Sequence, residues 1–147
     1  MNEDELRQAM AALEVYKAQL DSIVENMQLI QISLEELARA KETLIQYSKT
    51  APESEILVPI GGSSFIYAKV ATNTKALVGI GSGVTLEKSM DEAIKTVEER
   101  NLELMDSLKK LAEKRASIET DAARLSQAVD AEYQMLQQQQ LESAKKK

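Results

Sequence analysis

Apolar residues recur every seventh position along the first third of the chain, and a second apolar row follows three positions behind the first. Spacings that alternate between three and four residues predict a coiled-coil helix, which we expect from about Asp4 to Lys49. Such a helix is about 70 Å long, and Lys41 is the first polar residue to interrupt its seam. The two rows are Leu6, Leu13, Leu20, Met27 and Leu34, and Ala9, Tyr16, Ile23, Ile30, Leu37 and Leu44.

The last third of the chain repeats this pattern and predicts a second helix of about 80 Å that reaches to near Ala144. Ser89 and Glu92 have the spacing of a capping box at its start. Asn101 and Arg115 interrupt one row, and polar residues at such positions fix register and partner number at some cost in stability. The rows are Met90, Val97, Leu104, Leu111, Ile118 and Leu125, and Ile94, Leu108, Ala122, Val129 and Leu136.

All five glycines and both prolines lie between residues 50 and 84, so helix breakers are confined to the middle of the chain. Short apolar runs separated by turn residues predict two β-hairpins in sequence there. Pro59 has no N–H group to donate to a ladder, so the first strand is expected to be an edge or to carry a bulge. The four expected strands are Glu55–Ile60, Phe65–Val70, Lys75–Ile80 and Val84–Lys88.

Both faces of these strands carry apolar side chains. In the second strand Ile66 and Val70 point to one side, and Phe65 and Tyr67 point to the other. The chain offers little else to cover two apolar faces, and four short strands are marginal alone. We therefore expect the strands to pair with strands of other chains, which also protects their edges.

Composition excludes several classes of function. A formal net charge of −6 disfavours nucleic acid as a partner, and the basic end Lys145–Lys147 suits a helix C-terminus. The chain has no Cys and no His, which excludes disulfides, most zinc sites and Ser-His-Asp triads, and we expect no cofactor. The acidic N-terminus lacks a signal sequence and no run reaches about 18 apolar residues, so a cytoplasmic location without membrane contact is expected.

The glycines at 79, 81 and 83 raise the question of a phosphate-binding loop. A dinucleotide fingerprint requires a glycine as the sixth residue of the motif, where this chain has Val84 counted from Gly79 and Leu86 counted from Gly81. The predicted helix also begins too late to direct its amides at such a loop. Gly81 and Gly83 are better explained as permissive residues of a tight hairpin, and the glutamates within the helices as a solvated face.

Two stretches of the middle block, "VPIGGSSFIYAKV" at Val58–Val70 and "ALVGIGSGVTLEKSMDEAI" at Ala76–Ile94, closely resemble the α-class subunit of prefoldin, especially the archaeal type. The resemblance extends over essentially the whole chain. It implies a mainly α, α+β fold, in which a long antiparallel coiled-coil hairpin carries two β-hairpins that assemble into an intersubunit β-barrel. We expect one domain made of a helix over 1–50, an assembly region over 51–88 and a helix over 89–147.

The resemblance also implies a function without catalysis. Prefoldins are ATP-independent holdase co-chaperones in which two α and four β subunits form a hexamer. The partners implied for this chain are therefore β-type subunits, a second α subunit, unfolded client proteins and a group II chaperonin. Clients are expected at the ends of the coiled coil, where flexible apolar side chains suit contact of low specificity.

Candidate residues follow for both surfaces. For client contact they are Leu6, Met10, Leu13, Tyr133, Met135, Leu136 and Leu141. For subunit assembly they are Ile56, Val58, Ile60, Phe65, Ile66, Tyr67, Val70, Leu77, Val78, Ile80 and Val84. Leu6, Leu13 and Leu136 are also in register with the seam and so can pack within the coiled coil, and the strand residues can form a core within the chain.

Two other hypotheses use the same residues. A structural coiled-coil scaffold has the same heptads, and it would keep its function if the helix ends were made polar. A small nucleotide-dependent enzyme would need the glycine loop to bind a nucleotide, against the absence of the motif. Aggregation suppression without nucleotide distinguishes the holdase from both.

Overall fold

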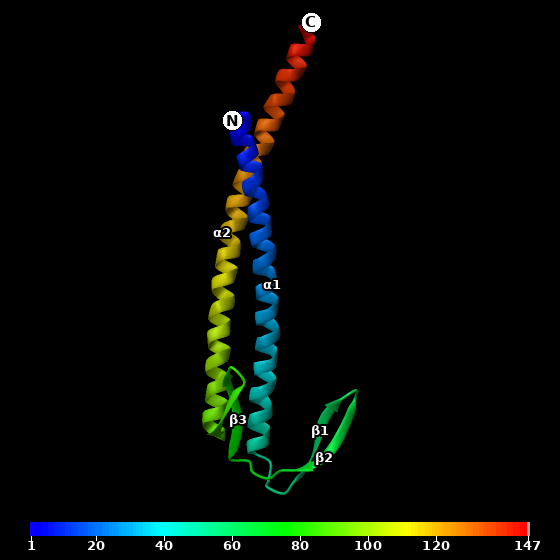
Figure 1. Ribbon diagram of the computed structural model, residues 1–147, viewed down its shortest axis with the longest axis vertical. Coiled ribbons are helices and arrows are strands. Elements are labelled where there is room, and N and C mark those ends of the chain that lie inside the picture. Colours follow the sequence, from blue (N-terminus) through cyan, green and yellow to red (C-terminus); the bar gives the residue numbers. More distant parts are fainter. Residues whose placement is uncertain (147) are drawn as a thin grey trace. The chain divides into compact units, whose positions relative to one another are not determined.

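A computed structural model describes residues 1–146 and shows two long helices joined through two β-hairpins (Figure 1). The mainly α architecture with two hairpins confirms the predicted fold class, and the observed bounds differ from the predicted ones by at most about two residues. Within the described residues neither helix has a segment long and apolar enough to cross a membrane. The elements are α1 (Glu3–Ser48), β1 (Glu55–Gly61), β2 (Ser64–Lys69), β3 (Lys75–Gly81), β4 (Val84–Ser89) and α2 (Met90–Lys145).

Contacts divide the chain into two compact units. One consists of Met1–Ile30 and Ser107–Lys147, and we call it the helix-end unit. The other is Gln31–Asp106, which contains all four strands, and we call it the hairpin unit. Each unit has its own apolar core.

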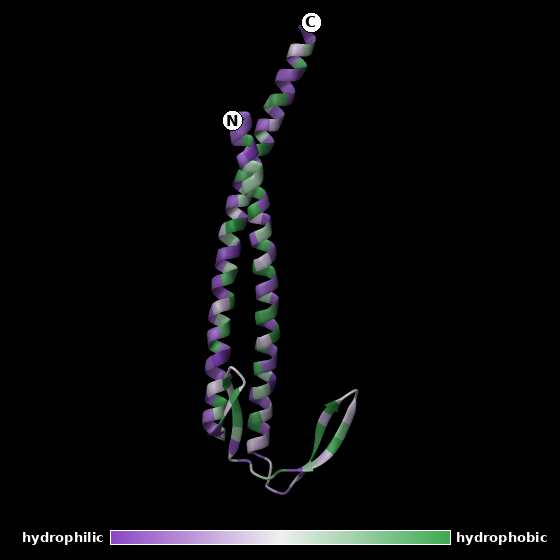
Figure 2. Ribbon diagram, in the orientation of Figure 1, coloured by the Kyte–Doolittle hydropathy of each residue, from purple (hydrophilic) through white to green (hydrophobic). Residues whose placement is uncertain are grey.

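The core of the helix-end unit is the predicted heptad seam. Ala9 and Ile23 from α1 and Ile118 and Val129 from α2 are buried, and all four belong to the predicted rows. Apolar residues recur at the same spacing along both helices, with hydrophilic residues between them (Figure 2). Arg115, which interrupts a row, is exposed and pairs with Glu119 one turn later at 2.8 Å.

A capping box that the heptad pattern did not predict begins α1. The Glu5 amide donates to Asn2 Oδ1 at 2.8 Å, and the Asn2 amide donates to Glu5 Oε2 at 2.9 Å. Each side chain thus satisfies a backbone N–H that the first helical turn leaves without a partner. The cap accounts for the start of the helix at Glu3.

The core of the hairpin unit gathers where α2 begins. Met90, Ala93 and Val97 on the first turns of α2 are buried, as are Val70 and Val78 from the strand region. The Glu92 amide donates to Ser89 Oγ at 3.3 Å, which confirms Ser89 as the residue that caps α2. Met90, Ala93 and Val97 therefore form one buried apolar stripe along the first two turns of α2.

The two hairpins are separate two-stranded antiparallel ladders, and we call β1–β2 the first hairpin and β3–β4 the second. The register of the first shifts between Pro59 and Gly61, so the strand carries the expected irregularity, and the second hairpin shifts at the equivalent place between Gly79 and Gly81. Gly81 and Gly83 have φ angles of +108° and +74°, as predicted for permissive turn residues. The two central residues of this turn, Ser82 and Gly83, both have positive φ, which matches the twist of the flanking strands.

The hairpins repeat each other 20 residues apart. Leu57 and Val58 align with Leu77 and Val78, and the two turns align as well. Both ladders have the same pairing pattern, and both registers shift at the same position. The repeat extends to Val70 and Met90, which are both buried directly after the two hairpins. It was not recognised from the sequence, although the alignment of LVPIG with LVGIG signals it.

Candidate functional site

Asn73 ties the segment between the hairpins to the end of α1. Its side-chain amide donates to the carbonyls of Ser48 at 3.2 Å and Thr50 at 3.0 Å. The carbonyls at a helix C-terminus lack intrahelical donors, so this side chain satisfies the carbonyl of the last residue of α1 and a second one just beyond it. A backbone hydrogen bond lies beside these contacts, in which the Val70 amide donates to Ser54 O at 2.9 Å. These contacts fix the base of the hairpins.

The second hairpin is held against α2 by side chains. The Arg100 guanidinium donates to Gly79 O, and Lys88 Nζ donates to Thr96 Oγ1 at 3.0 Å. Val78 is 7% exposed on the same side of the sheet as Lys88. In Figure 1 β3 accordingly runs beside the first turns of α2. Periodicity could not predict these contacts, because they depend on how a hairpin is placed on a helix.

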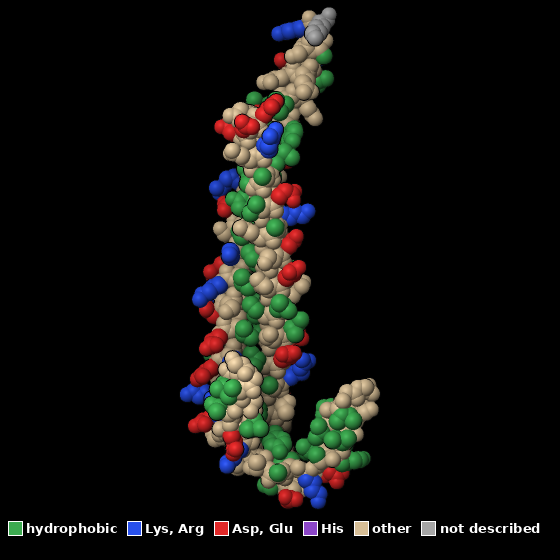
Figure 3. Space-filling model, viewed as in Figure 1, with side chains coloured by type: hydrophobic (Ala, Val, Ile, Leu, Met, Phe, Trp, Pro, Cys, Tyr) green, Lys and Arg blue, Asp and Glu red, His purple; other side chains and the backbone are tan. Residues whose placement is uncertain are grey.

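The predicted assembly residues divide into buried and exposed groups. Val70 and Val78 are buried within the chain, and Ile56 and Val58 are half-buried. Figure 3 shows apolar side chains gathered over β1 and β2 on the face in view. The exposed group, with 49 to 77% of each residue accessible, is Ile60, Phe65, Ile66, Tyr67, Leu77, Ile80 and Val84.

The predicted client residues also divide. Leu6 and Leu13 are half-buried in the seam, so both pack within the coiled coil. Tyr133 on α2 donates its hydroxyl to Met10 Sδ on α1 at 3.3 Å, which brings two predicted residues together from opposite ends of the sequence. The exposed group, at 38 to 63% accessible, is Met10, Tyr133, Met135, Leu136 and Leu141.

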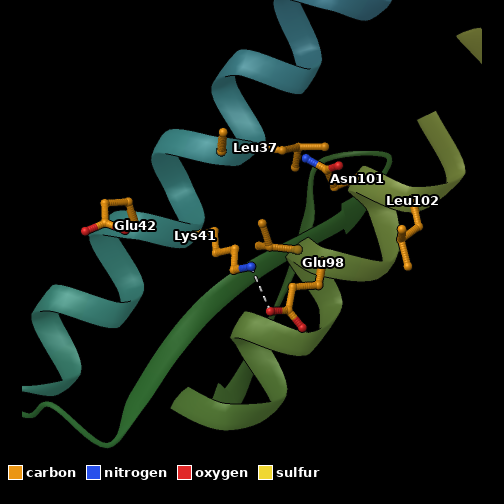
Figure 4. A pocket seen from close by; sticks show the side chains of 8 residues that line it. Leu37, Lys41, Glu42, Glu98, Asn101 and Leu102 are labelled. Atoms are coloured by element: carbon orange, nitrogen blue, oxygen red, sulfur yellow. Dashed lines mark ion pairs between the residues drawn. The ribbon is translucent and has the colours of Figure 1, made fainter. Parts of the chain in front are cut away.

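Polar residues interrupt the seam of the hairpin unit, and a hollow lies at that place. Lys41 Nζ pairs with Glu98 Oε1 at 3.0 Å, and Asn101 lies one turn further along α2 (Figure 4). Together with Leu37 and Leu102 they line a hollow of about 490 Å³. The predicted interruptions at Lys41 and Asn101 thus coincide in space, and polar groups occupy a place where apolar side chains would otherwise interlock.

Apolar contact is the chemistry that both surfaces offer. Within residues 1–146 no group of three or more His, Cys, Asp or Glu is placed to hold a metal ion. The hairpins present aromatic and branched side chains on strands, and the helix ends present methionine, leucine and tyrosine side chains on helices. Such surfaces bind other polypeptides through burial of apolar area.

Comparison with known proteins identifies relatives that match most of this chain. Residues 16–135 match the family described as Prefoldin subunit. The prefoldin subunit alpha of Methanothrix thermoacetophila is 37% identical over 109 residues, which cover 74% of this chain and 71% of that protein. The prefoldin subunit alpha of Pyrococcus horikoshii is 33% identical over 138 residues, covering 91% of this chain and 93% of that protein.

Solved structures show the same fold at lower identity. A filamentous PFD from Methanocaldococcus jannaschii superimposes with a TM-score of 0.57 at 24% identity, covering 82% of this chain and 94% of that one. The prefoldin beta subunit from Thermococcus strain KS-1 superimposes with a TM-score of 0.56 at 16% identity, covering 86% and 90%.

Proposed function

This chain belongs to the prefoldin subunit family, whose members are non-enzymatic chaperone subunits, and we propose that it is the α-type subunit of a holdase co-chaperone. In this proposal two copies assemble with four β-type subunits through their hairpins. The hexamer holds non-native polypeptides at the helix ends without ATP and passes them to a group II chaperonin in the cytoplasm.

The exposed apolar strands are the observation that carries the proposal. Phe65 and Tyr67 are 58 and 77% accessible on an ordered ladder, although Val70, close by in the chain, is fully buried. An apolar patch on regular strands marks an interaction surface, and unpaired strand edges favour pairing with further strands. Assembly with strands of other prefoldin subunits would cover both the patches and the edges.

The helix ends supply the proposed client surface. Met10 and Met135 are 45 and 54% accessible, and flexible thioethers adapt to partners of varied shape. Both lie beside the seam, so their side chains are available without opening the coiled coil. This arrangement supports contact with unfolded chains of no fixed sequence.

Mass in solution tests the assembly. We expect this chain, mixed with β-type prefoldin subunits, to form a species with the mass of a hexamer that contains two copies of it. Light scattering and native mass spectrometry measure the total mass and the copy number. A chain that stays monomeric with every β-type subunit would contradict the proposed assembly.

Aggregation suppression tests the client surface, and the chain offers closely matched controls. Met135 and Leu141 at the helix end are 54 and 63% accessible, and Met105 and Leu29 elsewhere on the helices are 53 and 63% accessible. We expect Met135→Gln with Leu141→Gln to weaken capture of an unfolded protein several-fold, in the presence or absence of nucleotide.

The control pair, Met105→Gln with Leu29→Gln, removes the same kinds of side chain at the same exposure. We expect it to leave capture unchanged, and both pairs to assemble normally. Equal loss in the two pairs would mean that no special client surface exists at the helix ends. Full activity of the first pair would favour the structural scaffold over the holdase.

A further inference from the structure

Methionine supplies every sulfur atom of this chain, which has six Met and no Cys. The structure divides the six by exposure. Met90 is 5% exposed in the core of the hairpin unit, and Met27 is half-buried in the seam. The exposed methionines, at 45 to 54% accessible, are Met1, Met10, Met105 and Met135. Exposed thioethers can be oxidised to sulfoxides, whereas a core shields the thioethers within it.

The sulfur of Met10 takes part in a contact between the two helices. Met10 Sδ on α1 accepts a hydrogen bond from the Tyr133 hydroxyl on α2 at 3.3 Å. Both residues belong to the helix-end unit. A chemical change at this sulfur would therefore change how the two helices are joined there.

The contact lies at the margin of the seam. Met10 directly follows Ala9, and Tyr133 lies one turn beyond Val129. Ala9 and Val129 are buried at 8 and 6% exposed, whereas Met10 and Tyr133 are 45 and 43% exposed. A small oxidant can therefore reach the Met10 side chain without opening the coiled coil.

Oxidation would change the strength of this contact. A thioether sulfur is a weak hydrogen-bond acceptor, and methionine sulfoxide carries a polar oxygen on that sulfur. The Tyr133 hydroxyl already donates to the sulfur, so a donor lies within reach of the new oxygen. A sulfoxide usually disrupts apolar packing because it is polar, but at Met10 it would gain a partner on the other helix.

We propose that Met10 is a reversible oxidation site whose sulfoxide accepts a stronger hydrogen bond from Tyr133 and joins the two helix ends more tightly. The oxidant is hydrogen peroxide. The sulfur lone pair forms an S–O bond to one peroxide oxygen while the O–O bond breaks, so sulfur loses two electrons and the peroxide gains them. The proton of the transferred oxygen passes to the leaving oxygen, which departs as water. A methionine sulfoxide reductase with a dithiol as reductant restores the thioether, and the products are a disulfide and water.

The consequence for client binding rests on the client surface proposed above. Met10 belongs to that surface, and its sulfoxide replaces a flexible apolar group by a polar one that is engaged with Tyr133. We expect oxidation to weaken capture of an unfolded protein roughly threefold. The hairpin unit should keep its structure under the same treatment, because Met90 in its core is shielded.

Met10→Gln tests the contact without an oxidant. Glutamine has a helix propensity similar to that of methionine, and its amide oxygen is a stronger acceptor than a thioether. We expect amide hydrogen exchange over Met1–Ile30 to slow roughly threefold in this variant. The same substitution in a Tyr133→Phe chain should not slow exchange, and neither should Met105→Gln, which changes a methionine of similar exposure. Exchange that responds equally with and without the Tyr133 hydroxyl would overturn the proposal.

Peptide mass mapping after mild peroxide treatment of the full chain tests the site itself. We expect Met10 and Met105 to become sulfoxides and Met90 to react at least about tenfold more slowly. Exchange in the treated chain should slow over the helix-end unit only when the Tyr133 hydroxyl is present. Treatment with methionine sulfoxide reductase and dithiothreitol should reverse the change. A Met10 that stays reduced while Met105 is fully oxidised would contradict the proposal.

Capture measured on each chain before and after peroxide separates this inference from the proposed function. The unmodified chain and Met105→Leu should lose capture equally, and Met10→Leu should lose less relative to its own untreated form. If untreated chains capture the unfolded protein and Met10→Leu loses as much as the others, the inference fails and the proposed function stands. If no chain captures it before treatment, but exchange slows on oxidation in a way that requires Tyr133, the oxidation site is supported and the proposed function is contradicted.

Discussion

The hairpins and the helix ends both expose apolar side chains, but they differ in what lies beneath. Phe65 and Tyr67 stand on a ladder whose base is fixed by the Asn73 bonds and by the fully buried Val70. Met135 and Leu141 stand on a single helix, among exposed residues on every side. Exposure alone therefore does not separate the two surfaces, whereas the rigidity of the support does.

That difference suits two kinds of binding. An ordered surface loses little conformational entropy on association and so favours one defined partner. A surface of long side chains on a weakly supported helix can adapt to many partners at lower affinity for each. We therefore expect the hairpins to bind specifically and the helix ends to bind broadly.

The largest effect should come from removing the support of the hairpins. Val70→Asp buries a carboxylate without a partner, and we expect it to destabilise the hairpin unit by at least about 3 kcal/mol. Mixed assembly should fail as a result. Thermal unfolding followed by circular dichroism measures the loss, and Val84→Asp on an exposed strand position is the control for stability only, because Val84 belongs to the predicted assembly surface. Assembly that survives Val70→Asp would show that the rigid base is unnecessary.

Asn73→Ala should loosen the same base less severely. The carbonyls of Ser48 at the end of α1 and of Thr50 just beyond it lose their donor, which costs about 1–3 kcal/mol where water does not fully replace it. Faster amide hydrogen exchange near Val70 and Thr74 would register the change. Asn26→Ala removes an exposed helical asparagine and should leave exchange in the hairpin unit unaltered.

Asn101→Leu should stabilise the hairpin unit rather than destabilise it. Asn101 lines the hollow of about 490 Å³ at an interrupted seam position, so a leucine there would extend the apolar row. We expect a gain of about 1 kcal/mol in unfolding free energy, with client capture at the helix ends unchanged. A fall in capture would mean that looseness in the hairpin unit contributes to client binding, and would weaken the contrast between the two regions.

The smallest effect is expected at the helix ends. Tyr133→Phe removes the hydroxyl that Met10 accepts, and an exposed bond to sulfur contributes less than about 1 kcal/mol. Capture should be retained, because the aromatic ring and the thioether both remain. A capture assay beside an unfolding curve tests this, and a several-fold loss would show that the contact between Tyr133 and Met10 orders the surface.

The sequence predicted local structure well, because local structure follows from spacing. Ile23, Val97 and Ile118 are buried where the heptads placed them, and the first strand carries the irregularity that was expected of it. The residue types of the turn also predicted the positive φ angles at Gly81 and Gly83.

Contacts between elements could not be predicted in this way. The bonds from Asn73 to α1 and from Arg100 to β3 depend on where a hairpin lies, and spacing carries no information about that. The heptad pattern also placed both Leu13 and Leu136 in the apolar seam. The structure half-buries the first and leaves the second 38% accessible, because the last turns of α2 extend past the beginning of α1.

The 20-residue repeat has a genetic consequence. Since the two ladders share one pairing register and each begins and ends at an equivalent place, a deletion that joins equivalent positions would leave one complete hairpin. A crossover from the codon for Val58 to that for Val78 would delete one repeat in frame and leave a single hairpin between two intact helices. A one-hairpin subunit and a two-hairpin subunit are thus separated by a single genetic event.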